Sequence, residues 1–372
     1  MKIGNLLVNA AYLGERVLTA IAVGAAKVWE GVSKYIKFAD PVVEQLCMKW
    51  SSDGIGLTPE DAAKVTDIGT TFLGNKEITS FEEFASFGVK DIIGFGDCSN
   101  LQSITIPAEA IVIKYGAFAR SGLTSIVIPN KIIKIEGYAF VNCNNMESIV
   151  IGDRVESMDG KSFGCPAKKV YINSLERWIN LPFDISPKPD FELYIDGEMI
   201  RDVVIPPSVK KLRSYVFKYS SIEKVSFEGI ILEIDGDAFS DCALTEFVCP
   251  NGVLSMNYAV FPRCKSLKTL DLSNYNGDIG NYFCIGCSTL SIVKLGTVTS
   301  IGAQAFNGCN ALQSVLIGAT TPPTLGSGVF SSSGITIYVP DESVEAYKSA
   351  TNWSAYADYI KPLSEYVEPT NE

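Results

Sequence analysis

The sequence predicts a β-rich solenoid in which short strands stack along the chain, with a small helical N-terminal cap and a helical C-terminal cap. Two observations predict it. A sequence motif recurs at steps of about two dozen residues, a period typical of solenoids, and apolar residues alternate inside each copy. The motif contains a phenylalanine, found at Phe95, Phe118, Phe140, Phe163, Phe217, Phe239, Phe261, Phe283, Phe306 and Phe330. The longer step from Phe163 to Phe217 indicates an insertion between two coils.

Each copy contains a six-residue run that predicts one strand. Its first, fourth and sixth residues are apolar, as in Leu123, Ile126 and Ile128. The fourth and sixth have the alternation of a strand with one buried face, and Pro129 or an equivalent glycine then ends the strand. A single unit cannot bury its apolar face alone, whereas stacked units bury a continuous core. We therefore expect the phenylalanines to form a ladder inside the stack.

The same sequence motif resembles that of a known family. The copy from Leu123 to Cys143 contains Leu-x-Ser-Ile-x-Ile-Pro, then Ile-x-x-x-Ala-Phe and a cysteine three residues later. In these elements, residues 95 to 360 resemble the BspA-like leucine-rich repeat proteins. The resemblance implies a leucine-rich-repeat-type right-handed coil of short strands that displays a sheet for binding. Many such proteins are secreted or lie on cell surfaces, and their partners differ widely.

Composition excludes several classes of function. The net charge is −11 and the pI is about 4.8, which argues against binding to nucleic acid or anionic membranes, because both attract clustered Lys and Arg. The chain has no histidine, so Ser/His/Asp and Cys/His nucleophilic sites and zinc sites with imidazole ligands are excluded. No charge-free run approaches the twenty or so residues that a membrane span needs.

Paired carboxylates are the remaining candidates for catalysis, as in glycoside hydrolysis. By residue type the pairs are Asp235 with Asp237 and Glu156 with Asp159. Each pair contains a variable position of the repeat, so a solvated coil edge explains them better. No nucleotide loop or metal cluster is evident. We therefore expect no enzymatic activity, no cofactor and no metal site.

The ten cysteines follow the repeat rather than a disulfide framework. Seven lie at or near one phase, just after the phenylalanine: Cys98, Cys143, Cys165, Cys242, Cys264, Cys287 and Cys309. Such a ladder predicts buried free thiols that pack as small apolar side chains, against the alternative of a secreted disulfide scaffold. Cys249 fills a core strand position. Cys284 and Cys287 form a CxxC, a weak signal for metal or redox chemistry because no second pair follows.

Residues 1–36 are interpreted as a short strand-forming attachment module. Glycines recur every ten residues at Gly4, Gly14 and Gly24 between apolar runs, which favours strands and turns. A signal peptide is the alternative, although Glu15 and Arg16 interrupt its apolar stretch. The Lys-Ile-Gly-Asn start, Tyr-Leu-Gly and Lys-Val-Trp of this segment resemble an N-terminal module of structural proteins from phages and prophages of gut bacteria. That resemblance implies attachment to a larger particle.

Residues 37–90 are predicted to form a helical cap on the first coil. Asp40 should cap a helix that starts at Pro41, and Thr58 should cap a second helix. Helix, glycine-containing loop and helix resemble a degenerate EF-hand of the dockerin type. A calcium loop needs oxygen ligands at alternate positions, and in residues 51–62 only Asp53 is well placed, so a structural role is favoured over calcium binding.

The leucine-rich repeats are assigned to residues 91–340, with an insertion at 174–200. The insertion should contain a short amphipathic helix, a proline-rich loop and a hairpin at Asp196-Gly197. Trp178 is read as core, with a ligand platform as the alternative. Residues 341–372 are predicted to form a C-terminal cap and tail, in which a helix with large aromatic residues covers the last coil and residues 365–372 are loose.

The fifth residue of each six-residue run should point away from the core, onto the exposed face of the sheet. The candidate ligand-binding residues in this row are Val127, Val150, Val204, Ser226, Val248, Asp271 and Lys294, with Thr105 and Leu316 at its ends. Strand propensity alone could place valines there, but contiguous exposed apolar area usually marks an interaction site. Because the row as read contains no aromatic residue, it favours a protein ligand over a sugar.

These observations together predict a non-catalytic recognition or adhesion protein. Its partner is expected to be a protein or glycoprotein on a cell surface, and a homo-oligomer stays open. The first hypothesis is a virion-associated receptor-binding or decoration protein of a phage or prophage, attached through residues 1–36. The alternative is a secreted or cell-surface bacterial adhesin. The expected location is therefore a virion or the extracellular surface.

Overall fold

The computed structural model of the chain describes residues 33–159, 161–181, 191–331 and 334–368. Most of the predicted attachment module, residues 1–32, lies outside the described residues. The same holds for Pro182, Pro187 and Pro189 of the insertion loop and for residues 369–372. The chain divides into two compact units, Met1–Met199 and Ile200–Glu372.

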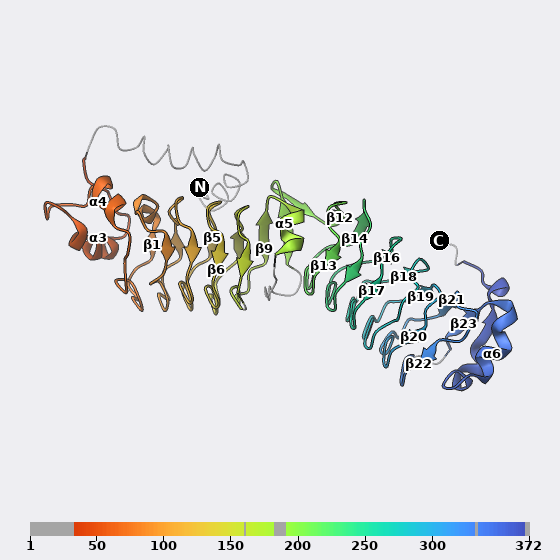
Figure 1. Cartoon of the computed structure of the whole chain (residues 1–372). Helices are drawn as coiled ribbons and strands as arrows, with labels where there is room; N and C mark the ends of the chain where they lie inside the picture. The colour runs from red at the N-terminus through yellow and green to blue at the C-terminus, as the bar shows by residue number, and fades with distance from the viewer. Residues whose placement is uncertain (1–32, 160, 182–190, 332–333, 369–372) are drawn as a thin grey trace. The chain divides into compact units, whose positions relative to one another are not determined.

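The first unit stacks short parallel strands in two ladders, and Figure 1 shows its labelled strands side by side. A long ladder joins strands that each hold a six-residue run: β5 (Ser125–Val127), β7 (Ser148–Val150), β9 (Lys169–Ile172) and β10 (Glu192–Ile195). A short ladder joins β2 (Asp91–Ile92), β4 (Val112–Ile113), β6 (Lys134–Ile135) and β8 (Ser157–Met158). Before them, β1 (Ser80–Phe81) pairs with β3 (Ser103–Ile104).

The second unit repeats this arrangement. Its long strands are β12 (Asp202–Ile205), β14 (Lys224–Phe227), β16 (Glu246–Val248), β18 (Thr269–Leu272), β19 (Ile292–Leu295), β21 (Ser314–Ile317), β23 (Thr336–Val339) and β24 (Ile360–Pro362). Its short strands are β13 (Lys211–Leu212), β15 (Glu233–Ile234), β17 (Ser255–Met256), β20 (Ser300–Ile301) and β22 (Thr324–Leu325). The predicted solenoid of short strands is therefore confirmed in both units.

The stacked phenylalanine ladder is confirmed at most positions. In the first unit, the ring centroids of Phe118 and Phe140 are 5.3 Å apart and the rings are 7° from parallel, and Phe163 follows Phe140 at 4.9 Å. In the second unit, Phe239 and Phe261 stack at 5.3 Å. All of these rings are buried. Each coil therefore supports the aromatic core of the next.

Phe283 is the exception, and the prediction that it joins the ladder is wrong. Its ring is tilted 64° to that of Phe261. Its carbonyl oxygen accepts the Phe261 backbone N–H, just as the carbonyl oxygen of Ala139, the residue before Phe140, accepts the Phe118 backbone N–H. Tyr282 has φ of 60°, like Tyr138, which lies two residues before a ladder phenylalanine. By that spacing Cys284 occupies the ladder position, and the CxxC is a product of this one-residue shift.

The insertion is partly a coil of its own. Helix α5 (Leu175–Asn180) is confirmed, and Ser174 caps it through a bond from the Arg177 backbone N–H. Strand β10 then continues the long ladder beside β9, and a tight turn at Asp196 and Gly197 leads to β11 (Glu198–Ile200). Trp178 is 2% exposed, with its ring 6.1 Å from that of Phe191, which confirms it as core.

Short helices lie towards both ends of the solenoid. At the N-terminal side, Asp40 caps α3 (Pro41–Cys47) and Thr58 caps α4 (Pro59–Lys64), as predicted, with the 3-10 turns η1 (Met48–Trp50) and η2 (Glu82–Ser86) beside them. Asp40 also accepts a hydrogen bond from the Thr79 backbone N–H at 2.6 Å. The bonds to Asp40 therefore fasten the start of α3 to the chain that enters the repeats.

At the C-terminal side, α6 (Val344–Ser349) lies among the 3-10 turns η3 (Asp341–Ser343), η4 (Ser354–Tyr359) and η5 (Leu363–Glu365). Tyr347 and Trp353 are fully buried, and they donate hydrogen bonds to the carbonyl oxygens of Ala319 and Pro323, both at 2.7 Å. Because these side chains satisfy carbonyls of the preceding coil, α6 and the turn that follows it are anchored by polar as well as apolar contacts.

Candidate binding surface

We define the outer row as the fifth residue of each long strand's six-residue run. In strands such as β18 and β19 the fourth and sixth residues are buried while the third and fifth are partly exposed. Successive strands are parallel and in register, so that Val127 pairs with Val150 and Asp271 with Lys294. The outer row is therefore a continuous line of side chains on each set of paired strands.

In the first unit the outer row forms a compact cluster, the first-unit patch, made of Val127, Val150, Tyr171 and Tyr194. The rings of Tyr171 and Tyr194 stack at 4.5 Å with 26° between their planes. Val150 and Tyr171 are each only 8% exposed. Two of the predicted residues are thus brought together, and two tyrosines that the sequence analysis missed lie beside them.

These tyrosines contradict the prediction that the outer row contains no aromatic residue. The triplets Val170-Tyr171-Ile172, Leu193-Tyr194-Ile195 and Ile337-Tyr338-Val339 carry the same alternation as the other copies. Tyr171 was missed because its run begins with the small residue Ala167, and Tyr194 because its strand was assigned to the inserted hairpin. Reading the middle residue of every apolar-x-apolar triplet would have found all three tyrosines.

The phenols of the first-unit patch are neutral at ordinary pH. Burial raises the pKa of both Tyr171 and Tyr194 above 10.0, and the Glu192 carboxylate raises each further. The Tyr194 hydroxyl donates a hydrogen bond to Glu192 Oε2 at 2.8 Å. The patch therefore presents an apolar body with a polar tip.

In the second unit the outer row begins with exposed side chains. Val204 and Val248 are 48% and 55% exposed, and Ser226 on the strand between them is also exposed. Charged residues lie alongside: the Lys224 and Glu246 side chains form an ion pair at 3.5 Å. Two valines held on hydrogen-bonded strands with a charged border have the composition of a small interface core with a polar rim.

Further along, the outer row is already engaged by the end of the chain. Lys294 Nζ lies 2.9 Å from Glu368 Oε1, and this carboxylate is the main cause of a raised pKa of Lys294. The Tyr366 ring packs edge-on against Tyr338 at 5.0 Å. The prediction that residues 365–372 are loose is therefore wrong for Tyr366 and Glu368. Asp271 lies beside Lys294 in register, as predicted.

The degenerate calcium loop is closed by its own hydrogen bonds. Asp53 Oδ1 accepts the Ile55 backbone N–H at 2.9 Å, while Oδ2 accepts the Tyr35 hydroxyl at 2.7 Å and pairs with Lys34 at 2.9 Å. The hydrogen bonds from the Ile55 backbone N–H and from the Lys34 and Tyr35 side chains hold the pKa of Asp53 well below its usual range. Asp53 therefore acts as a structural bracket for this loop.

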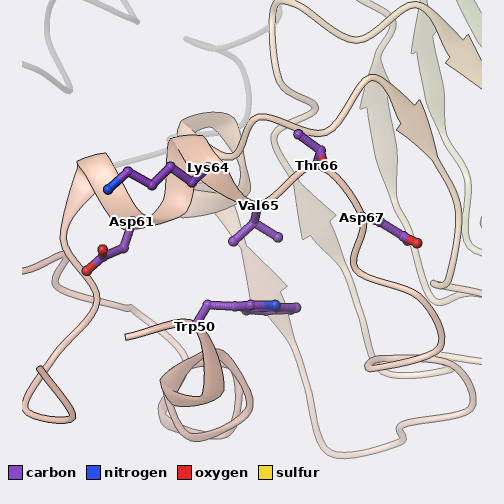
Figure 2. A pocket seen from close by; sticks show the side chains of 6 residues that line it. All are labelled: Trp50, Asp61, Lys64, Val65, Thr66 and Asp67. Carbon is purple, nitrogen blue, oxygen red and sulfur yellow. The ribbon is translucent and has the colours of Figure 1, made fainter. Parts of the chain in front are cut away.

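One open pocket lies beside α4, and Figure 2 shows its lining residues Trp50, Asp61, Lys64, Val65, Thr66 and Asp67. Asp61 accepts a hydrogen bond from the Ser52 hydroxyl at 3.0 Å, and Asp67 accepts the Gly69 backbone N–H at 2.7 Å. The carboxylates are thus turned towards their own loops, and the pocket offers no convergent set of polar groups for a ligand.

The cysteines and acidic pairs have structural partners. All ten cysteines are free and buried, as predicted, and burial raises the pKa of the Cys47 and Cys249 thiols to about 12. Cys143 Sγ donates to the Phe118 carbonyl oxygen of the preceding coil at 3.1 Å. Of the acidic candidates, Asp235 pairs with Lys211 at 3.0 Å. The thiols act as small core side chains, and a neighbouring cation engages this carboxylate on the coil edge.

Among the described residues, no helix combines the length and apolar character needed to cross a bilayer.

Comparisons with known proteins give one family match and several solved structures. A family model described as the BspA type leucine-rich repeat region matches residues 66–181, 196–313 and 277–352. No curated protein matches the chain significantly. A leucine-rich repeat protein from Bacteroides ovatus is 18% identical over 74% of this chain and 88% of that chain, with a TM-score of 0.40. One from Eubacterium ventriosum is 20% identical over 66% and 81%, with a TM-score of 0.44. The pneumococcal vaccine antigen PcpA is 15% identical over 74% and 75%, with a TM-score of 0.38.

Proposed function

Because the chain belongs to the BspA-type leucine-rich repeat family, we propose that it is a non-catalytic recognition protein that binds a cell-surface protein through its outer row. The observation that carries this proposal is the exposure of Val204 and Val248 on either side of Ser226. Apolar side chains fixed on paired strands lose little conformational freedom on binding. Their charged border, including Lys224 and Glu246, would exclude water around a small apolar contact.

The first-unit patch supports the same role. Tyrosine combines a large apolar area with a hydrogen-bonding tip, and it is enriched at the energetic centres of protein interfaces. Tyr171 and Tyr194 also keep few rotamers because their rings stack on each other. A partner would contact this patch through its partly exposed members, Val127 and Tyr194, since Val150 and Tyr171 are buried, and would meet preorganised side chains there.

The experiment is a cell-binding assay with matched surface variants. Labelled protein is incubated with bacterial and epithelial cells, before and after protease treatment of the cells, and bound label is counted by flow cytometry. We expect binding to be lost after protease treatment and in the variant Val204→Asp/Val248→Asp. The control Leu254→Asp changes a side chain of the same unit that is 72% exposed but lies outside the outer row. Equal binding of the Val204/Val248 variant and the wild type would contradict the proposal.

For the setting, we propose that residues 1–36 attach the solenoid to a phage or prophage particle, with a secreted or cell-surface adhesin as the alternative. The support is the resemblance of Lys2-Ile3-Gly4-Asn5 and the motifs after it to particle proteins. N-terminal sequencing of the mature protein separates the two. An intact Met1 or Lys2 supports the particle, whereas loss of the first 25 or so residues, as a signal peptide would give, supports export.

We also propose that the terminal helices cap the solenoid, because open ends would expose apolar edges. Burial of Tyr347 and Trp353 supports this role at the C-terminal end. The expected effect of Trp353→Ala is a loss of about 3–5 kcal/mol of unfolding free energy, the usual range for emptying a buried aromatic site. Urea unfolding measures it, and an unchanged stability would contradict the capping role.

A further inference from the structure

A row of tyrosines lies where the chain leaves the short ladder and turns towards the ladder phenylalanine. At this turn the backbone has positive φ: Gly116 has 64°, Tyr138 has 60°, and in the second unit Tyr215 and Tyr282 have 68° and 60°. Glycine adopts this conformation without steric cost, whereas a bulky residue is strained there. The same turn position holds Lys161, Asp237, Ala259 and Gln304 in other coils, so the geometry of the coil imposes this conformation. The exposure of the tyrosine rings, rather than the backbone strain, is what needs a reason.

The rings of this edge are exposed. Tyr115 is 64% exposed and Tyr138 is 37% exposed, and their centroids are 5.4 Å apart with 53° between the ring planes. In the second unit, Tyr258 and Tyr282 are 63% and 43% exposed. Core packing does not explain exposed rings, and they lie on a different edge of the coil from the outer row.

The groups beside the rings are charged but mutually neutralised. Lys114 Nζ lies 3.6 Å from Asp91 and 3.5 Å from Glu136, and Glu136 also accepts the Tyr115 backbone N–H at 3.0 Å. Across the next coil, Lys134 pairs with Asp159 at 3.3 Å, and Lys161 Nζ lies 5.9 Å from the Tyr138 ring centroid, so three ammonium groups stand against three carboxylates. The edge thus combines aromatic faces with fixed carboxylate and ammonium groups while presenting no strong net charge to attract a charged polymer.

We propose that Tyr115 and Tyr138 form a binding subsite for a neutral polysaccharide, separate from the outer row. The C–H face of a pyranose ring packs against the electron-rich face of an aromatic ring, and sugar hydroxyls hydrogen-bond well to ionised carboxylate and ammonium groups. A spacing of 5.4 Å between the two rings is close to the length of one sugar unit along a glycan. Neighbouring rings can therefore contact neighbouring sugars.

The repeat makes this site additive. In the second unit, Tyr258 and Tyr282 are again exposed on neighbouring coils, and Asn257, next to Tyr258, donates a hydrogen bond to Asp235 Oδ1 at 2.9 Å. A polysaccharide offers many identical sugars, so several weak contacts by one chain raise the overall affinity without a deep cleft. Polysaccharide binding at this edge therefore needs no deep cleft of the kind found in small-molecule sites.

Affinity electrophoresis in native gels tests the proposal, with soluble starch, hydroxyethyl cellulose, xylan and galactomannan as four separate probes. The full-length wild type is compared with Tyr115→Ala/Tyr138→Gly. Glycine relieves the positive φ at position 138, so the variant should stay folded, which circular dichroism checks. We expect retardation of the wild type by at least one probe and a dissociation constant about tenfold larger for the variant. Tyr359→Ala, which removes an exposed ring in η4, is the control and should bind like the wild type.

Two results would overturn the proposal: no retardation of the wild type by any of the four probes, or equal retardation of the wild type and the Tyr115/Tyr138 variant. The Val204→Asp/Val248→Asp variant separates this site from the outer row. It should keep its polysaccharide binding, so that failure of either proposal is seen independently of the other.

Discussion

The side chains of the outer row are largely buried in the first unit, where we call the row closed, and exposed at the start of the second, where we call it open. Both units nevertheless use the same strand motif. Val150 lies between Val127 and Tyr171 in register and is 8% exposed, whereas Val248 pairs with Asp271 and is 55% exposed. The backbone register fixes the direction of each side chain, and the size of its neighbours on adjacent coils decides how much of it reaches solvent. In a solenoid a binding surface is thus set by pairs of coils rather than by single residues.

The same comparison extends to the phenylalanine ladders. In the first unit, ring stacks such as Phe118 on Phe140 are nearly parallel, while the second unit contains a coil in which Cys284 replaces the ladder ring and Phe283 is tilted. The second unit also uses Glu368 to pair with Lys294 of its outer row. The second unit is therefore less regular than the first in both its ladder and its outer row. Four substitution experiments test this contrast.

The largest effect is expected from Phe140→Ala. This ring is fully buried and stacks on Phe118 and Phe163, so its removal should lower the free energy of unfolding by about 3–5 kcal/mol. Urea unfolding followed by circular dichroism measures the loss. Tyr115→Ala, at an exposed ring of the same unit, serves as the control and should change stability by less than about 0.5 kcal/mol.

The next effect compares equivalent positions of the outer row. Tyr171→Ala removes a buried ring that stacks on Tyr194 and should cost about 1–3 kcal/mol. Val248→Ala, on the open part of the row, should stay within about 0.5 kcal/mol of the wild type. If the two substitutions cost the same in urea unfolding, the contrast between the closed and open parts of the row is wrong.

A smaller effect should appear at high pH. The pKa values of Tyr171 and Tyr194 are raised in the folded protein above 10.0, so their contribution is complete below pH 10 and is lost as the pH rises through the folded pKa values. Above pH 10 the unfolded chain binds fewer protons than the folded one, and stability falls. The variant Tyr171→Phe/Tyr194→Phe should lose less stability between pH 9 and pH 11 than the wild type, as measured by urea unfolding at each pH. An unchanged slope would contradict neutral, desolvated phenols.

The smallest effect concerns the ion pair between Lys294 and Glu368. The Glu368 side chain is largely exposed, so a double-mutant cycle with Lys294→Ala and Glu368→Ala should give a coupling of about 0–1 kcal/mol. Raising the salt concentration should reduce it further. A coupling well above this range would mean that the chain end is a structural part of the outer row.

Most of the repeat could be predicted from the sequence because strand alternation and the phenylalanine spacing are local patterns. The exchange of Phe283 for Cys284 in the ladder could not, because both residues suit a core and the turn conformation at Tyr282 decides between them. Tyr171 was missed because a small first residue, Ala167, obscured its run. The contact of Glu368 with Lys294 joins residues far apart in the chain, and no local pattern reports it.

Thiol labelling tests the central claim, that neighbouring residues of each long strand alternate between a buried core and an outward row. Since all ten native cysteines are buried, the folded wild type should show no fast reaction with a maleimide reagent. Val204→Cys, at a site 48% exposed, should add one fast-reacting thiol, while Val203→Cys, at a site 2% exposed, should add none. Equal rates for the two new thiols, or fast labelling of the wild type, would contradict the account.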